Sequence, residues 1–193
     1  MTAQEEPTIR AAVPGDAEAL ARLHVAVWRE TYSGIAPVEA VERLDERRRL
    51  ASWRDALGED AKGGVLVACQ GDEIVGLVSY GPASTAALGD RGEVKHLYVA
   101  SSCRGMGCGK RLLHRALDDL RASGCRRVGL AVVRENAEAR RFYRAMGGQE
   151  VGEFQDAGPL WRSNNVLVEW AVADDAALAS RTSRPPANPV RIA

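Results

Sequence analysis

The stretch SSCRGMGCGKRLL, residues 101–113, places three glycines on alternate positions before a basic residue and an apolar helical pattern. Glycine loses more backbone entropy on ordering than other residues, so this run indicates a backbone that comes close to something a Cβ atom would block. The helix that follows offers unpaired N–H groups and the positive end of its dipole, which together favour an anion. The stretch therefore predicts a loop that binds a phosphate group at the start of a helix.

Two common nucleotide-binding loops do not fit this spacing. A P-loop needs a glycine where the sequence has Arg104, and a serine or threonine where it has Arg111. A dinucleotide-binding fingerprint needs its third glycine where the sequence has Lys110 or Leu112. Both motifs are excluded, and the pattern that remains is R-x-x-G-x-G, which ends at Gly109.

The composition predicts one globular domain over residues 1–173. The chain has 193 residues, of which 46% are hydrophobic and 27% charged, enough for one core. Residues 174–193 contain three prolines and little periodicity, which predicts a flexible C-terminal tail. The 26 basic residues balance the 26 acidic ones, so no overall field favours nucleic acid or an anionic membrane. No run of about 18 apolar residues indicates a membrane span.

The cysteines and histidines indicate neither a metal site nor a disulfide framework. Their positions, four cysteines and three histidines, match no paired zinc-ligand spacing. Free thiols are typical of a reducing compartment, so we expect no metal and a cytoplasmic protein.

Strand and helix patterns interleave along the chain. We expect strands over residues 8–13, two within 63–81 that form a hairpin, and others over 93–100, 126–133, 149–154 and 165–172. We expect helices over residues 20–28, 38–44, 47–57, 112–120 and 136–147, with Asp16 as the cap of the first. This order predicts an α/β (α+β) architecture, with a mixed sheet covered by helices on both faces.

With its surroundings, the loop resembles the GCN5-related N-acetyltransferase (GNAT) family. The pyrophosphate loop of that family has Gln or Arg, two variable residues, Gly, one variable residue, then Gly or Ala. The preceding HLYVASS resembles the family's strand whose backbone pairs with the acyl carrier arm, and VVRENAEARRFYRAMGGQEVGE resembles its next strand and helix. The resemblance runs from about residue 8 to 172, with its specific part in residues 93–154. It implies a GNAT-type, mostly antiparallel central sheet.

The resemblance implies acetyl-CoA as the acetyl donor, bound mainly by backbone. A strand before the loop would hydrogen-bond the pantetheine amides, and the loop N–H groups would hold the pyrophosphate. The donor-binding residues that it implies are Leu97, Tyr98, Val99, Arg104, Gly105, Met106, Gly107, Cys108, Gly109, Lys110 and Asn136. A helix N-cap is an alternative role for Asn136.

Two residues are candidates for acid–base catalysis. Tyr143 matches the family tyrosine that protonates the CoA sulfur, with a core aromatic as the alternative. Glu93 matches the base of histone-type relatives, and strand alternation puts it on the face of Leu97 and Val99. A charged residue at a strand entrance is the alternative for Glu93. Ala131 stands where relatives that acetylate ribosomal protein N-termini have glutamate, which weakens that substrate class.

The acceptor pocket is expected to include Trp28, Tyr32 and Trp161, although Trp28 and Tyr32 are also spaced as a core pair. The sequence thus predicts an N-acetyltransferase for the primary amine of a small molecule: an antibiotic, a polyamine or an amino-acid derivative. Acetylation of protein N-termini or lysines is the second hypothesis, and a CoA-binding sensor without turnover is the third. The expected partner is the amine alone, without nucleic acid or membrane, and a homodimer is left open.

Overall fold

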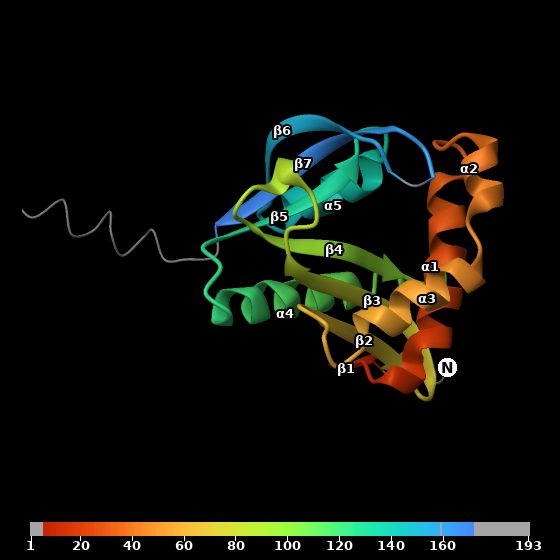
Figure 1. The fold of residues 1–193 in the computed structure, drawn as a ribbon. Helices are drawn as coiled ribbons and strands as arrows, with labels where there is room; N and C mark the ends of the chain where they lie inside the picture. The colour runs from red at the N-terminus through yellow and green to blue at the C-terminus, as the bar shows by residue number, and fades with distance from the viewer. Residues whose placement is uncertain (1–5, 159, 172–193) are drawn as a thin grey trace, which may run out of the picture.

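One seven-stranded sheet organises the molecule (Figure 1). The computed structural model describes residues 6–158 and 160–171, so the predicted tail, residues 174–193, lies outside the described residues. The strands are β1 (Thr8–Ala11), β2 (Gly64–Gln70), β3 (Glu73–Pro82), β4 (Gly92–Val99), β5 (Arg127–Val133), β6 (Gln149–Asp156) and β7 (Ser163–Ala171). Their order is β1-β2-β3-β4-β5-β7-β6, and every neighbouring pair is antiparallel except β4 and β5. The predicted mixed, mostly antiparallel sheet is confirmed.

Helices cover both faces of the sheet, as the sequence predicts. The helices are α1 (Ala17–Tyr32), α2 (Val38–Arg43), α3 (Glu46–Ala56), α4 (Cys108–Ala122) and α5 (Ala137–Ala145), with short 3₁₀ turns over Pro14–Asp16, Ala86–Leu88 and Ser101–Cys103. Successive side chains of a strand point to opposite faces of the sheet, so alternate residues of β2 pack against the helices on one face or the other. Val67 packs with Leu20 of α1 and Trp53 of α3, whereas Leu66 packs with Leu112 of α4.

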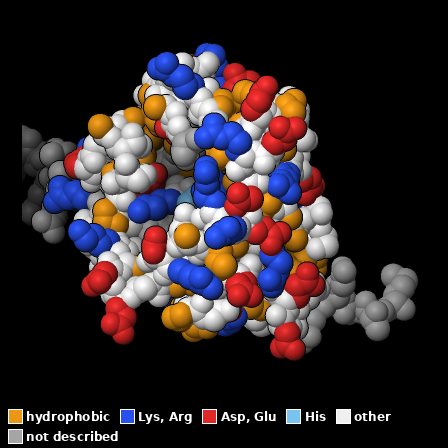
Figure 2. Space-filling view, turned by 45° about the vertical axis from the view of Figure 1, so that its right-hand side comes forward, with side chains coloured by type: hydrophobic (Ala, Val, Ile, Leu, Met, Phe, Trp, Pro, Cys, Tyr) orange, Lys and Arg blue, Asp and Glu red, His pale blue; other side chains and the backbone are white. Residues whose placement is uncertain are grey.

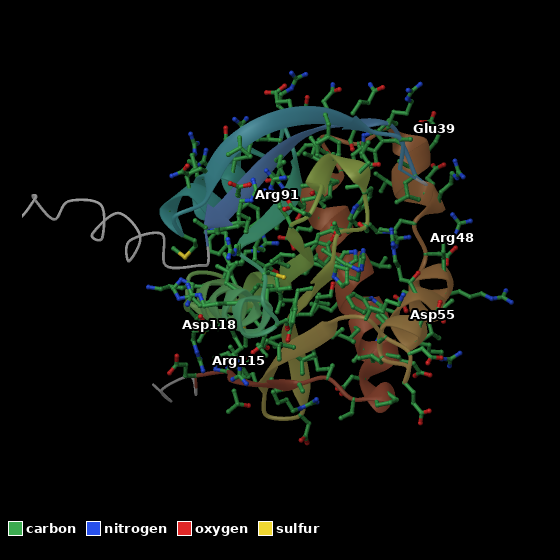
Figure 3. The ribbon with its side chains drawn as sticks, turned by 60° about the vertical axis from the view of Figure 1, so that its left-hand side comes forward. Glu39, Arg48, Asp55, Arg91, Arg115 and Asp118 are labelled. Atoms are coloured by element: carbon green, nitrogen blue, oxygen red, sulfur yellow. The ribbon has the colours of Figure 1, made fainter. Side chains whose placement is uncertain are left out.

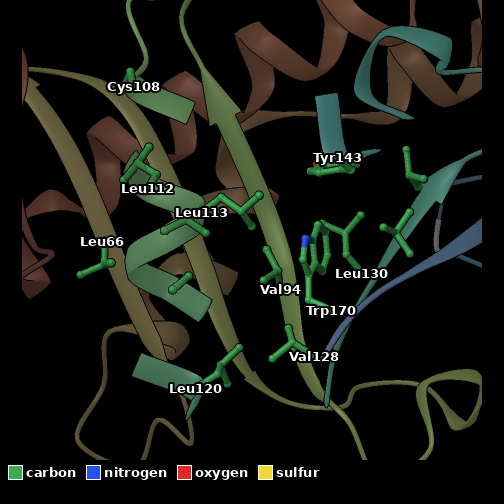
Figure 4. Packing of buried hydrophobic residues seen from close by; sticks show 14 of the residues in the cluster. Leu66, Val94, Cys108, Leu112, Leu113, Leu120, Val128, Leu130, Tyr143 and Trp170 are labelled. Atoms are coloured by element: carbon green, nitrogen blue, oxygen red, sulfur yellow. The ribbon is translucent and has the colours of Figure 1, made fainter. Parts of the chain in front are cut away.

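Helix α4 supplies the centre of the larger core cluster (Figure 4). Its apolar residues Leu112, Leu113, Ala116 and Leu120 recur at helical spacing and are at most 4% exposed. Full burial of a leucine contributes about 1.5–3 kcal/mol, so this face holds the helix against the sheet. The N-terminus of α4 is therefore fixed in position by packing rather than by its loop.

Asp16 stands at the predicted N-cap position of α1, but its side chain makes no capping hydrogen bond to that helix. Its carboxylate bonds instead to the guanidinium of Arg10 at 2.7 and 2.9 Å, and accepts a further hydrogen bond from the N–H of Val13 at 2.8 Å. A two-pronged, charge-assisted contact of this kind is stronger than a bond to a neutral N–H group at a helix start. Asp16 thus ties β1 to the turn that precedes α1.

A bulge in β4 reverses the alternation of its side chains. Ser79 of β3 pairs with His96, but the next residue, Tyr80, pairs with Val94, which leaves Lys95 as the extra residue. Val94 consequently lies in the same core cluster as Leu97, although the two are three positions apart.

Candidate active site

A cleft opens in the middle of the sheet where β4 and β5 separate. The two parallel strands pair only at Gly92 with Val128 and at Glu93 with Gly129, and then diverge. The space between them has a volume of about 770 Å³ and is lined by residues of β4, β5, α1, α5 and the glycine loop. Figure 2 shows a hollow on one face of the molecule, with Lys and Arg side chains around it and a histidine side chain inside.

The glycine loop borders one end of this cleft. Gly105 and Gly107 have φ angles of +77° and +76°, a backbone conformation that favours glycine, and a Cβ atom at either would meet nothing within 4 Å. The N–H of Arg111 donates to the carbonyl of Gly107 at 3.0 Å and closes the first turn of α4. The N–H groups of the preceding turn have no acceptor within the helix. The open space and these donors fit the pyrophosphate of an acetyl-CoA molecule.

The divergence of the strands suits an extended ligand with amide groups. Leu97, Tyr98 and Val99 line the cleft and lie beyond the last residue of β4 that pairs with β5. Their backbone on that side can therefore hydrogen-bond a chain that lies in the gap, as an added strand would. The residues present fit the pantetheine arm of the donor.

Charged residues of the loop take different places. Arg104 lines the cleft and forms an ion pair with Glu30 of α1, at 2.9 and 3.2 Å between their nitrogen and oxygen atoms. Lys110 lines the cleft and is exposed. Arg111 instead bonds to the carboxylate of Glu6 and to the carbonyl of Pro7, both at 2.8 Å.

Tyr143 lies in the wall of the cleft that α5 forms. Its side chain is 7% exposed, and its ring contacts Phe142 and Trp170 edge to face, with centroid distances of 5.4 and 5.9 Å. Figure 4 shows Tyr143 above Trp170 and Leu130. Burial raises the pKa of the Tyr143 hydroxyl well above its ordinary value, so this hydroxyl stays protonated at neutral pH. Tyr143 therefore packs in the core and also lines the cleft, so the two roles predicted for it are compatible.

Asn136 has the predicted capping role and also faces the cleft. Its side-chain oxygen accepts a hydrogen bond from the N–H of Ala139 at 3.1 Å, which caps α5. The amide group of Asn136 also interacts with the hydroxyl oxygen of Tyr32, toward which it donates a hydrogen bond, and both residues line the cleft.

Of the three aromatic residues expected in the acceptor pocket, the cleft lining includes Tyr32 alone. Trp28 is 6% exposed and packs with Leu44. Its ring contacts Tyr32 at 5.0 Å and Trp161 at 5.5 Å between centroids. Trp28 and Trp161 thus support the ring of Tyr32 from behind, and the core pair of Trp28 and Tyr32 is present.

Two other predicted site residues lie outside the cleft lining. Met106 packs against the core cluster below the loop. Glu93 is 6% exposed, and its carboxylate accepts hydrogen bonds from the N–H and the hydroxyl of Ser84, at 2.7 and 3.0 Å. The bulge at Lys95 moves Glu93 off the face of Leu97 on which strand alternation placed it. Glu93 stays outside the cleft because it pairs with Gly129 of β5, before the two strands diverge.

His96 is a cleft residue that the sequence analysis did not single out. Its Nδ1 lies 2.8 Å from the hydroxyl oxygen of Ser79, and its ring lies 5.0 Å from that of His24. Burial and the nearby Arg49 lower the pKa of His96 to about 4, and burial likewise lowers the pKa of His24. Both imidazoles are therefore neutral at pH 7. Only the bulge, which the sequence does not reveal, turns His96 toward α1.

These lowered pKa values predict a loss of stability on acidification. Between pH 6.5 and about 4, His96 is protonated in the unfolded chain but stays neutral in the folded protein. The free energy of unfolding therefore falls as the pH falls. We expect roughly 2 kcal/mol from His96 over that range, allowing for its partial exposure. Urea denaturation at pH 7, 6, 5 and 4 measures it. The slope should be smaller in His96→Asn, and an unchanged slope would contradict the assignment.

Other features of the described residues mark no second catalytic centre. A smaller cavity of about 400 Å³ lies beside β1 and contains none of the predicted site residues. Within residues 6–158 and 160–171 there is no group of three or more His, Cys, Asp or Glu side chains placed to hold a metal ion. No helix in that part of the chain has the length and apolar character needed to cross a membrane.

Known proteins are similar to this chain in sequence and in fold. The model of the Acetyltransferase (GNAT) family matches residues 21–147. The uncharacterized N-acetyltransferase YuaI of Bacillus subtilis is 27% identical over 153 residues, which cover 78% of this chain and 86% of the relative. The aminoglycoside N(6')-acetyltransferase type 1 of Stenotrophomonas maltophilia is 30% identical over 149 residues, 75% of this chain and 87% of the relative.

Among solved structures, the PaiA N-acetyltransferase of Thermoplasma acidophilum in complex with coenzyme A superposes with a TM-score of 0.67. It has 20% sequence identity, and the match covers 86% of this chain and 99% of that one. The match to a family model extends over more than half of the chain, and the cleft, loop and strand divergence fit the donor that this family uses. The chain therefore belongs to the GNAT family and is an acetyl-CoA-dependent N-acetyltransferase.

Proposed function

We propose that the enzyme transfers the acetyl group of acetyl-CoA to the primary amine of a small molecule. The observation that carries this proposal is that three features lie in one cleft. They are a glycine loop at the start of α4, a stretch of β4 that does not pair with β5, and the side chain of Tyr143 with its hydroxyl group. The cytoplasmic location remains a prediction from the sequence, and the homodimer remains open.

Binding of the donor falls mainly to backbone groups. The N–H groups from Gly105 to Lys110 hold the pyrophosphate, aided by the positive end of the α4 dipole. The backbone of Leu97 and Val99 holds the amide groups of the pantetheine arm. This arrangement directs the thioester along the gap between β4 and β5, toward Tyr143.

Transfer needs the amine in its neutral form, because free alkyl amines are protonated near pH 7. Water in the cleft takes the first proton from the ammonium group, and the nitrogen lone pair then attacks the thioester carbonyl carbon. The C–S bond breaks, and Tyr143 donates its hydroxyl proton to the departing thiolate. The second nitrogen proton returns through water to Tyr143. Glu93 is assigned no part in this sequence, since Ser84 binds its carboxylate outside the cleft.

The relatives matched by sequence support a small-molecule acceptor, whereas one similar solved structure, from Brucella melitensis, is named a ribosomal-protein-alanine N-acetyltransferase. Two of them are named for small molecules: the aminoglycoside enzyme, and the L-methionine sulfoximine/L-methionine sulfone acetyltransferase of Pseudomonas paraeruginosa, which is 28% identical over 134 residues. A second observation points the same way. Ala131 lines the cleft at the position where enzymes that acetylate ribosomal protein N-termini are expected to have a glutamate. The sensor hypothesis gains nothing from the structure, because the hydroxyl-bearing Tyr143 faces the donor cleft.

The test is release of CoA thiol from acetyl-CoA over a panel of small amines, peptides and proteins, with mass spectrometry of the products. We expect thiol release with small amines, together with a mass increase of one acetyl group on the amine. Acetylation of peptides or proteins alone would favour the second hypothesis. Binding of acetyl-CoA without turnover of any acceptor would overturn the proposed function in favour of a sensor.

A further inference from the structure

A cluster of polar side chains beside the cleft lacks hydrogen-bond partners. In the part of the chain that the structure describes, four buried side-chain nitrogen or oxygen atoms have no partner. Three of these four lie together: His24 Nδ1, Arg49 Nε and Trp53 Nε1. Buried polar groups are nearly always hydrogen-bonded, so three such atoms in one place indicate an absent partner. We call these three residues the His24–Arg49–Trp53 cluster.

None of the three cluster residues is part of the cleft lining, and the cluster lies behind two lining residues of β4. The ring of His24 lies 5.0 Å from that of His96 and 4.8 Å from that of Tyr98, and both of these residues line the cleft. The ring of Trp53 lies 5.8 Å from His24 and 5.4 Å from His96. Arg49 precedes Trp53 by one turn of α3, which places both on the same side of that helix.

The neighbouring residues of α3 show that this inward position is particular to Arg49 and Trp53. Arg48 and Asp55 are exposed and point away from the sheet, as Figure 3 shows. The hydrogen bonds and ion pairs of the described residues include none made by the Arg49 side chain, and burial lowers the pKa of its guanidinium. Asp45 is near enough to interact electrostatically with Arg49 but forms no ion pair with it. A half-buried cation without a paired anion is costly, so an anion bound directly to the guanidinium would be stabilised.

The chemistry of the unpaired atoms identifies the missing partner. The Nε of arginine and the indole nitrogen of tryptophan donate hydrogen bonds and never accept them, so they cannot satisfy each other. For these two groups the partner must supply acceptor atoms, and the charge of Arg49 favours a negative group. His24 Nδ1 donates to the same partner in the tautomer that has its proton on Nδ1. A carboxylate has two acceptor oxygens in a plane that matches the guanidinium group.

We propose that the His24–Arg49–Trp53 cluster binds a carboxylate of the acceptor, so that the acceptor is an amino acid or another amine that carries a carboxylate. This inference rests on the proposed function, which it narrows. Tyr98 contacts the ring of His24 and lines the same cleft as Tyr143, so it stands between the cluster and the reaction centre. The amine of a small acceptor then faces Tyr143 while its carboxylate reaches Arg49. Polyamines and aminoglycosides, which are cations, are disfavoured at this site.

The test compares matched acceptors at saturating acetyl-CoA. Leucine, glutamine and phenylalanine are each assayed beside their amides and their decarboxylated amines, with spermidine and an aminoglycoside as cations. For at least one of the amino acids, we expect kcat/KM of the carboxylate form to exceed that of its neutral analogues at least tenfold. In Arg49→Met we expect a loss of about 10- to 100-fold for that amino acid, the effect of removing a hydrogen bond to a charged group. Its amide should change less than about threefold.

Two further variants keep the test decisive. Arg48→Met removes an exposed arginine from the next position of α3 and should leave the preference intact. Arg49→Lys, which keeps the charge and loses the planar fork, should show a smaller loss of the same preference and replaces Arg49→Met if that variant does not fold. Circular dichroism and acetyl-CoA affinity establish that each variant is folded.

The possible outcomes distinguish a failure of the carboxylate site from a failure of the proposed acetyltransferase function. Thiol release with neutral or cationic amines but not with carboxylate-bearing ones would overturn the carboxylate site and leave the enzyme an acetyltransferase. An unchanged acid-to-amide ratio in folded Arg49→Met would also overturn it, and would mean that ordered water satisfies the cluster. Acetyl-CoA binding without thiol release from any amine, peptide or protein would overturn the proposed function itself.

Discussion

Replacing Gly107 with glutamate is expected to raise the dissociation constant for acetyl-CoA at least about 100-fold, the equivalent of two lost hydrogen bonds to a charged group. Gly107 stands at the N-terminus of α4, and a Cβ atom there meets nothing within 4 Å, so the new side chain enters the space assigned to the pyrophosphate. Its carboxylate repels the phosphate charges and competes for the same N–H groups. Isothermal titration calorimetry with acetyl-CoA measures the change.

Gly71→Glu is the matched control for this experiment. Gly71 lies in the turn between β2 and β3, also has a positive φ angle, +58°, and also leaves a Cβ atom in open space. Both substitutions put a side chain in the left-handed region, which costs roughly 1–2 kcal/mol of stability. The two variants should therefore lose similar stability, and only Gly107→Glu should lose acetyl-CoA. Unchanged affinity in folded Gly107→Glu would remove the loop from the donor site.

Local motifs account for the part of the site that the sequence predicted. The positions from Arg104 to Gly109 and the capping residue Asn136 belong to single turns, where residue type and spacing largely determine the backbone. The amphipathic pattern of α4 likewise fixes which side meets the sheet, and its buried leucines are the ones that the pattern indicates. The order of strands and helices was predictable for the same reason.

What the sequence did not predict depends on register and on contacts between distant segments. The face of Glu93 was predicted from strict alternation, and one extra residue, Lys95, reverses that alternation before Leu97. A bulge of this kind leaves no clear sign in the residue types. The His24–Arg49–Trp53 cluster depends on how α1 and α3 pack together across the intervening α2. Its defining feature is a set of missing hydrogen-bond partners, which only the three-dimensional structure reveals.

Tyr143→Phe is expected to reduce kcat by about 10²- to 10⁴-fold, the usual contribution of general acid–base catalysis, with little change in acetyl-CoA affinity. The substitution removes one hydroxyl and keeps the ring, whose edge-to-face contacts with Phe142 and Trp170 hold it in the cleft wall. The lost interaction matters as charge develops on sulfur, so it lowers kcat rather than weakening ground-state binding. Thiol release with an accepted amine and calorimetry on the same preparation measure both quantities.

Tyr80→Phe provides the comparison that separates catalysis from packing. The Tyr80 hydroxyl donates to Asp119 outside the cleft, so its removal costs stability, about 0.5–1.5 kcal/mol, without reaching the reaction centre. If Tyr143 served only the core, Tyr143→Phe would resemble Tyr80→Phe, with a small change in stability and a normal kcat. A wild-type kcat in Tyr143→Phe would therefore exclude the acid role. A fully folded Tyr143→Phe with a reduced kcat, compared with a normally active Tyr80→Phe, would assign the protonation of the leaving thiolate to the Tyr143 hydroxyl. Both variants lose a hydroxyl group, but only that of Tyr143 belongs to a residue of the cleft.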